Sequence, residues 1–272
     1  HNDTAVCIAG NVAGGVEDFA EKMNADARAI GCEDTYYISP KGLEGGDAEG
    51  GHHTTAADLA LVLRYCITQS PQAEAFLEIT GTAQYTFTDI SGKHSYSCAN
   101  HNAFLWMMDG ALTGKTGFTA KAGYCYVGAL TKGEKSFTIA LLACGWPNNR
   151  TWKWHDARLL LEYGLEAFDQ RSLQQPDLPK TLLVENGQLA EVSLNCPKKE
   201  IRMLLSRGDQ TDVRVSLPGQ LTAPVEAGEQ VGTVSYLVNG ALYEQLPVTV
   251  AFGVPKITYC YCLKRLLALV LL

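Results

Sequence analysis

The sequence predicts an α+β protein, in which an antiparallel sheet flanked by helices precedes a small all-β sandwich domain. Three observations lead to this fold class. Apolar residues recur at helical spacing in the first part of the chain, strand-like alternation replaces this pattern between residues 85 and 144, and a helical pattern then returns. Beyond residue 180, short alternating runs are separated by closely spaced turn signals, which is typical of a β-sandwich.

Helices are expected in the N-terminal part of the chain. Apolar side chains recur at helical spacing over residues 16–30, and Gly31 follows as a stop signal. A second helix is expected from Thr54 to Ile67, because a threonine followed three residues later by Asp58 resembles a capping box. Pro71 is expected to open a short third helix.

Strands are expected after these helices. Residues 85–88 and 94–98 alternate on either side of a Ser91-Gly92 turn and predict a hairpin. Three further strands are expected at residues 112–119, 122–130 and 136–144, and one more helix at residues 152–168.

A domain boundary is expected at residues 170–179, which contain three glutamines and two prolines and lack apolar periodicity. The predicted organisation is a first domain over residues 1–169, this linker, a β-sandwich over residues 180–255 and a tail over residues 256–272. We expect the apolar run at residues 263–272, with Lys264 and Arg265, to begin a membrane-anchoring tail. An ordinary frayed helix remains the alternative.

Composition excludes several classes of function. The 272 residues contain 22 Lys and Arg against 29 Asp and Glu, a net charge of −7, so we expect no nucleic-acid partner. The nine cysteines are scattered, and Cys260-x-Cys262 does not match the spacing of a zinc site. We therefore predict neither a metal nor a cofactor.

The strongest chemical signal is Lys115-Thr116-Gly117, on a predicted strand and after Gly114. On a strand edge, the lysine ammonium and the threonine hydroxyl suit the binding of a carboxylate, and glycine lets a ligand approach the backbone. The sequence around this triplet lacks the glycine spacing of a phosphate-binding loop. Near the start of the chain, Asn2 precedes an apolar helical run, and helix capping alone explains it.

Five segments stand in a characteristic order along residues 1–168: Asn2-Asp3-Thr4-Ala5, Glu21-Lys22-Met23-Asn24, 34–43, 54–60, and Gly114-Lys115-Thr116-Gly117-Phe118-Thr119 with 122–125. This order resembles the low-molecular-mass penicillin-binding D-alanyl-D-alanine carboxypeptidases, and the β-rich remainder looks like their membrane-proximal domain. The resemblance implies a β-lactamase/DD-peptidase-like fold. It also implies serine acyl transfer with three motifs, Ser-x-x-Lys, Ser-x-Asn and Lys-Thr-Gly.

The resemblance assigns residues of this chain to two of the three motifs. Asn2 matches the asparagine of Ser-x-Asn with His1 at the middle position, and Lys115, Thr116 and Gly117 match the third motif. No serine of the chain has a lysine three residues later. The resemblance therefore implies that the nucleophile motif and the serine of the second motif precede His1, and that the chain as given forms no acyl-enzyme.

The resemblance also implies roles for the matched residues. Asn2 would orient the proton-relay network and the substrate's peptide group, while Lys115 and Thr116 would hold the free carboxylate of the terminal D-alanine. The backbone N–H of Phe118 would contribute to the oxyanion hole. Arg150 lies near a site-proximal arginine of the family, although a solvated arginine at a helix start is an equal expectation. Lys115 and Asn2 are accordingly expected to face one cleft.

We expect a bacterial cell-wall enzyme that removes the terminal D-alanine from peptidoglycan stem peptides and is acylated by β-lactam antibiotics. The resemblance implies an extracytoplasmic location on the outer face of the cytoplasmic membrane, where nine thiols are unusual. Two alternatives stay open: a β-lactamase-like hydrolase, which shares the three motifs, and a catalytically inactive cell-wall-binding module.

Overall fold

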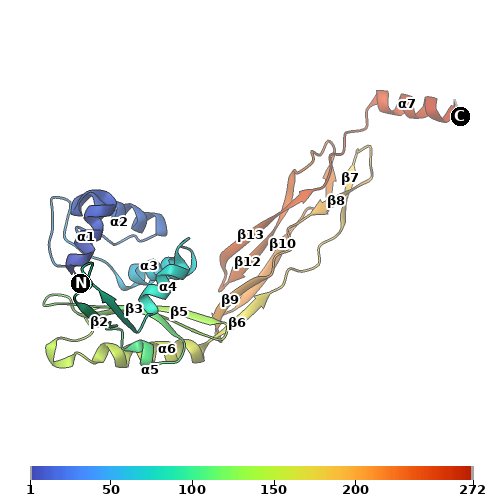
Figure 1. Cartoon of the computed structure of the whole chain (residues 1–272). Helices are drawn as coiled ribbons and strands as arrows, with labels where there is room; N and C mark the ends of the chain where they lie inside the picture. Colours follow the sequence, from blue (N-terminus) through green and yellow to red (C-terminus); the bar gives the residue numbers. More distant parts are fainter. Residues whose placement is uncertain (1, 271–272) are drawn as a thin grey trace. The chain divides into compact units, whose positions relative to one another are not determined.

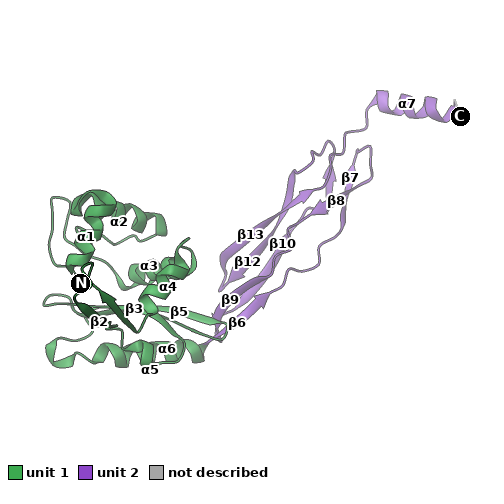
Figure 2. Ribbon diagram, viewed as in Figure 1, with its two compact units in different colours: residues 1–167 green, residues 168–272 purple. Residues whose placement is uncertain are grey.

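The computed structural model describes residues 2–270, and the chain divides into two compact units, residues 1–167 and 168–272 (Figure 2). The predicted α+β class is confirmed: unit 1 contains helices on either side of an antiparallel sheet, and unit 2 is built from strands up to its last helix (Figure 1). His1, predicted to lie in the Ser-x-Asn motif, is outside the described residues.

The helices of unit 1 are α1 (Asn2–Ala13), α2 (Val16–Ile30), α3 (Ala56–Thr68), α4 (Ala73–Gly81), α5 (Phe104–Met107) and α6 (Trp152–Ala167), with a short 3-10 turn at Pro147–Asn149. The stop signal after α2 acts as predicted, because Gly31 has a left-handed φ of 96° and its N–H bonds the last carbonyls of the helix. The predicted cap of α3 is also present: the Thr55 hydroxyl accepts the N–H of Asp58 at 3.1 Å.

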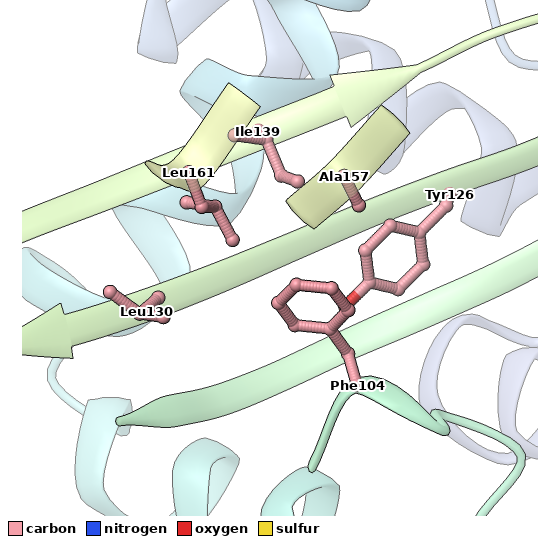
Figure 3. Packing of buried hydrophobic residues seen from close by; sticks show 6 residues of the cluster. All are labelled: Phe104, Tyr126, Leu130, Ile139, Ala157 and Leu161. Atoms are coloured by element: carbon pink, nitrogen blue, oxygen red, sulfur yellow. The ribbon is translucent and has the colours of Figure 1, made fainter. Parts of the chain in front are cut away.

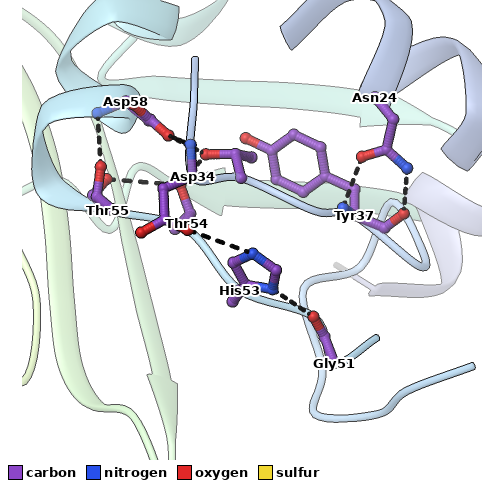
Figure 4. Close-up of polar contacts among 9 residues, drawn as sticks. Asn24, Asp34, Tyr37, Gly51, His53, Thr54, Thr55 and Asp58 are labelled. Atoms are coloured by element: carbon purple, nitrogen blue, oxygen red, sulfur yellow. Dashed lines mark hydrogen bonds and ion pairs between the residues drawn. The ribbon is translucent and has the colours of Figure 1, made fainter. Parts of the chain in front are cut away.

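Buried polar side chains hold the loop between α2 and α3 (Figure 4). The Asn24 amide exchanges two hydrogen bonds with the backbone of Tyr37, at 2.7 and 2.8 Å. Asp58 accepts the hydroxyl of Thr35 at 2.6 Å and the N–H of Asp34 at 3.0 Å. These bonds, that of Thr35 first, lower the pKa of Asp58 and keep it ionised. The loop that they anchor contributes to the candidate site described below.

Two sheets occur in unit 1. Strands β1 (Gln84–Thr88) and β2 (Ser95–Ala99) form the predicted hairpin, and β3 (Ala111–Thr119), β4 (Gly123–Lys132) and β5 (Lys135–Leu141) form an antiparallel sheet in that order. Strand β5 ends three residues before the predicted end at Cys144. Ala143 takes a left-handed φ of 53° there, after which the N–H of Cys144 bonds the carbonyl of Tyr124 at 2.8 Å.

A cluster of apolar side chains joins this sheet to α5 and α6 (Figure 3). The cluster comprises Phe104, Tyr126, Leu130, Ile139, Ala157 and Leu161, all at most 9% exposed. Full burial of one such side chain contributes about 1.5–3 kcal/mol. This packing fixes β4 and β5 against α6, and β3, which carries the Lys-Thr-Gly segment, is held in place by its pairing with β4.

Unit 2 contains a two-stranded and a six-stranded sheet. Strands β6 (Phe168–Leu173) and β9 (Ile201–Ser206) form the first, and the second has the order β10-β12-β13-β8-β7-β11. The strands of the larger sheet are β7 (Thr181–Glu185), β8 (Glu191–Asn195), β10 (Thr211–Ser216), β11 (Gln220–Thr222), β12 (Gln230–Val238) and β13 (Ala241–Val250). Side chains from both sheets, including Leu173, Ile201 and Val234, share one buried cluster, so the sheets pack face to face.

The boundary between the units differs from the one expected. Residues 170–173 were predicted as linker, but they belong to β6, which pairs with β9 along its whole length. Leu173 at the end of this strand is buried, and this burial outweighs the polar composition of the segment. The extended, strand-free stretch is limited to residues 174–180.

The last described element is α7 (Tyr259–Val270), whose side chains are exposed apart from the half-buried Tyr261. Within residues 2–270, none of the helices combines the length and the apolar character needed to cross a bilayer.

Candidate active site

A groove of about 870 Å³ in unit 1 brings together most of the residues that the sequence singled out. Its walls come from the start of α1, the loop at Pro40 and Lys41, the end of β2 with the residues after it, strand β3, and the start of α6. The predicted site residues that line it are Asn2, Lys115, Thr116, Gly117 and Phe118. Strand β3, which carries Lys115, and the N-terminus of α1 thus line the same groove.

A second hollow, of about 970 Å³, lies along α2 and is rich in acidic side chains. Its Tyr36 hydroxyl donates to Asp47 at 2.8 Å and lies 3.2 Å from Glu49, and these bonds raise the pKa of Tyr36 to about 12. The tyrosine therefore stays protonated, and the carboxylates of Asp47 and Glu49 are occupied in holding it. The residues that line this hollow include neither Asn2 nor any residue of the Lys-Thr-Gly segment, so we place the candidate site in the first groove.

Strand β3 presents the Lys-Thr-Gly segment to the groove. Lys115 is exposed, and its ammonium donates to the carbonyl of Thr116. A Cβ added at Gly117 would meet nothing within 4 Å, so the backbone there is open to a ligand. The ring of Phe118 packs against that of Tyr124, with 4.5 Å between centroids, and this contact fixes the edge of the strand next to the glycine.

Two buried side chains that are hydrogen-bonded to each other, Tyr126 and Asn102, pack against Gly114 of β3. The hydroxyl of Tyr126 donates to Oδ1 of Asn102 at 3.0 Å, and the same oxygen accepts the N–H of Phe104 at 3.2 Å. Burial raises the pKa of Tyr126, which therefore remains a hydrogen-bond donor. A Cβ at Gly114 would lie 2.6 Å from the Tyr126 hydroxyl and 2.8 Å from Nδ2 of Asn102, so only glycine fits there. No motif in the sequence identifies Asn102 as part of the site.

The structure adds a second cation that the sequence analysis did not identify. Lys153 lines the groove and is only 7% exposed; its Nζ donates to the carbonyl of Arg150 at 2.6 Å. The ammonium also lies 4.4 Å from the ring centroid of Tyr124 and 4.9 Å from that of Trp154. Desolvation, as the largest cause, lowers the pKa of Lys153. A buried ammonium in a groove is suited to an anionic ligand.

Arg150, which the sequence analysis placed at the site, has an exposed side chain and does not belong to the described residues that line the groove. It follows the 3-10 turn, and its backbone carbonyl, rather than its guanidinium, contributes by binding Lys153. The sequence carried no local signal for Lys153, because one of the two rings beside its ammonium belongs to Tyr124 on β4 and the other to its neighbour Trp154.

Two side chains with nucleophilic atoms near the groove lack activation. The thiol of Cys144 donates to Asp156 at 3.0 Å, and desolvation together with this bond raises its pKa to about 11, so it is protonated at neutral pH. Ser97 lines the groove, and its oxygen accepts the hydroxyl of Thr86 at 3.2 Å. Within the described residues, no base is hydrogen-bonded to Ser97, whereas a serine nucleophile requires one.

Two family models match the chain. Residues 1–143 match the model described as D-alanyl-D-alanine carboxypeptidase, and residues 168–256 match the model of the penicillin-binding protein 5 C-terminal domain. The curated D-alanyl-D-alanine carboxypeptidase DacC of Escherichia coli is 30% identical over 94% of this chain and 61% of its own length. DacF of Bacillus subtilis is 24% identical over 97% of this chain and 66% of its own length. The chain therefore spans less than two thirds of the length of these relatives.

Solved structures agree with these matches. Penicillin binding protein 5 from Haemophilus influenzae superposes with a TM-score of 0.66 over 94% of this chain and 71% of its own; at 23% identity this establishes a shared fold. A D-alanyl-D-alanine carboxypeptidase from Mycobacterium tuberculosis H37Rv is 30% identical, with a TM-score of 0.52 over 60% of this chain and 58% of its own.

Proposed function

The chain belongs to the D-alanyl-D-alanine carboxypeptidase family, and from that premise we propose that its groove binds the C-terminal D-Ala-D-Ala of a peptidoglycan stem peptide for serine-type acyl transfer. One observation carries the proposal: the ammonium of Lys115, the open backbone at Gly117 and the buried ammonium of Lys153 line the groove that Asn2 also lines. A substrate that ends in a free carboxylate matches two cations facing one space.

Each groove residue has a proposed role. Lys115 and the Thr116 hydroxyl hold the terminal carboxylate, because a charge-assisted hydrogen bond to an anion is roughly twice as strong as a neutral one. The N–H of Phe118 stabilises the oxyanion, to which one donor typically contributes about 2.7–4 kcal/mol in the transition state. The Asn2 amide orients the peptide group of the substrate. Lys153 supplies a second positive charge, which its low exposure leaves little screened by solvent.

The nucleophile proposed for this chemistry is the serine of a Ser-x-x-Lys motif, in which the lysine accepts the hydroxyl proton. The 272 residues contain no serine followed three residues later by a lysine. We therefore expect this chain to bind the terminal dipeptide and to form no covalent adduct with a β-lactam. A fluorescent penicillin that labels this chain would mean that the nucleophile has been misplaced.

The test of the proposed substrate is equilibrium binding. A short peptide that ends in D-Ala-D-Ala is titrated into the chain by calorimetry and compared with its C-terminal amide, which lacks the carboxylate. We expect the free acid to bind more tightly, and Lys115→Ala to remove this preference while Lys132→Ala, at an exposed position on β4, leaves it unchanged. Equal affinities for acid and amide in the unmodified chain would overturn the proposal.

We further propose an extracytoplasmic protein whose α7 lies on a membrane surface. Leu263, Leu266, Leu267 and Val270 recur at helical spacing and are between 45% and 80% exposed, beside Lys264 and Arg265. An exposed apolar stripe with neighbouring cations favours the interface of an anionic bilayer. Co-sedimentation with anionic vesicles, lost on replacing Leu266 and Leu267 by serine, tests this; sedimentation that is equal for both forms would contradict it.

A further inference from the structure

Three aromatic side chains lie exposed on one face of the β1–β2 hairpin: Tyr85 (64% exposed), Phe87 (44%) and Tyr96 (49%). The strand register places Phe87 opposite Tyr96, and their ring centroids are 5.3 Å apart at an interplanar angle of 24°. The rings of Tyr85 and Phe87 are 6.3 Å apart, at the same angle. The three rings therefore form a continuous row of similar orientation, which we call the aromatic strip.

The opposite face of the hairpin carries hydroxyl groups. Thr86, Thr88, Ser95 and Ser97 alternate with the aromatic residues, and the cross-strand pairs bond each other at 3.2 and 3.4 Å. Every residue of both strands is exposed. A strand pair usually buries its apolar face, so an aromatic row left in solvent is a feature of binding surfaces rather than of packing.

A further hollow lies between one end of the aromatic strip and the substrate groove. It measures about 410 Å³, lies between α4 and the aromatic face and is bordered by Ile79 and Tyr85. Cys98, Ala99 and Asn100 line both this hollow and the groove that contains Lys115. The Asn100 amide donates to the carbonyls of Thr80 and Thr82 at 2.9 and 3.0 Å, which fixes the shared wall to the end of α4.

We propose that the aromatic strip binds the glycan chain to which the stem peptide is attached, as a chain of N-acetylated amino sugars. This inference rests on the proposed function, since it requires a peptide substrate carried by a polysaccharide. The apolar faces of sugar rings pack on aromatic rings, while the sugar hydroxyl and amide groups bond neighbouring polar side chains. The strip is uncharged, as a neutral glycan requires, and the groove beside it accommodates the peptide.

A membrane is a poorer occupant of the same surface. The basic side chains of the hairpin are those of Lys93 and His94, and the ring of His94 is bonded to Asp89 at 2.9 Å. Surfaces that bind anionic lipid carry clusters of lysine and arginine, which residues 84–99 lack. Charge therefore favours the neutral polysaccharide.

The experiment titrates a peptide-free β-1,4-linked tetramer of N-acetylglucosamine into the chain and follows ring resonances of the tyrosines by NMR. We expect saturable binding that Tyr96→Leu weakens about fivefold, because one lost ring contact corresponds to roughly 1 kcal/mol. Tyr96→Phe should retain the affinity, since it keeps the ring. Thr88→Ala, on the hydroxyl face, is the matched control and should change nothing.

Lys115→Ala separates this inference from the proposed function. The variant should lose the preference for a peptide carboxylate while binding the tetramer as before. Failure of the peptide assay with intact tetramer binding would overturn the proposed function alone. The glycan inference is overturned if the tetramer does not bind, if Tyr96→Leu and Tyr96→Phe bind it equally, if Lys115→Ala abolishes its binding, or if anionic vesicles bind in its place in a Tyr96-dependent manner.

Discussion

The two units bury different kinds of side chain. Among the described residues, those with polar or charged side chains that are buried all belong to unit 1: Asn24, Ser39, Asp58, Asn102, Thr113 and Lys153. The interior of unit 2 is dominated by valine and leucine, with Val192, Val234, Val248 and Val254 fully enclosed. Burying a polar group costs free energy unless it is hydrogen-bonded, so a region that retains several of them has a use for them.

Those buried polar groups shape the candidate site. Asn24 and Asp58 hold the loop that supplies Pro40 and Lys41, whereas Asn102 and Lys153 line the groove themselves. Among the described residues of unit 2, the buried side chains are mainly aliphatic, and the hydroxyl of the fully buried Tyr236 has no hydrogen-bond partner. Unit 1 therefore retains buried polar groups around the candidate site, whereas the interior of unit 2 is mainly apolar.

Equivalent core truncations in the two units give the largest expected effect. Leu161→Ala, in unit 1, and Leu246→Ala, in unit 2, should each lower the free energy of unfolding of its own unit by about 2–5 kcal/mol. Only Leu161→Ala should also weaken binding of the D-Ala-D-Ala peptide, because Leu161 and Lys153 share α6. Urea denaturation and calorimetric titration measure the two quantities. Loss of peptide binding in a folded Leu246→Ala variant would contradict the division of roles.

Local signals in the sequence were sufficient for the elements that carry them. The helix cap at Thr55, the stop at Gly31 and the strand predicted over residues 112–119 each depend on residues close together in the chain, and all three appear in the structure. The order of the motifs indicated that Asn2 and Lys115 share a groove, which periodicity alone does not show. The roles of these residues stay predictions.

The structure differs from the sequence-based prediction where contacts between residues far apart in the chain determine the local conformation. The composition of residues 170–173 predicts a linker, but their pairing with residues 201–204 of β9 makes them a strand. Lys153 has no sequence feature that sets it apart from other helical lysines, and its ammonium lies against the ring of Tyr124 on β4. Asn102 belongs to no motif; its partner Tyr126 lies 24 residues away. Such contacts depend on the tertiary fold and leave no local pattern.

Removing the hydrogen bond between Tyr126 and Asn102 should lower the free energy of unfolding by less than a core truncation does. Asn102→Ala leaves the buried hydroxyl of Tyr126 without its partner, which should cost about 1–3 kcal/mol. Tyr126→Phe alone should cost about 1 kcal/mol, and the double variant should be less destabilised than the sum of the two. Urea denaturation of the four proteins measures this coupling. Strict additivity would mean that the pair does not act as a unit.

The stability of the chain and its affinity for the peptide should both depend on pH through the buried ammonium of Lys153. Because desolvation lowers its pKa in the folded chain, the folded state releases this proton before the unfolded chain does at about 10.5. Below the pKa of the folded chain, the free-energy cost of burying the charged form is fully present. This cost falls as the pH rises through the folded pKa. The free energy of unfolding should therefore increase with pH until the pH passes the pKa of the unfolded chain. Affinity for the peptide carboxylate should move in the opposite direction, since the neutral amine no longer attracts the anion. Lys153→Met should remove this trend in stability and reduce the alkaline loss of affinity, of which Lys115 causes the remainder, whereas a Lys132→Met control, at an exposed position, should preserve both profiles. If the pH profile of affinity is the same for Lys153→Met and the unmodified chain, the second cation of the groove is not Lys153.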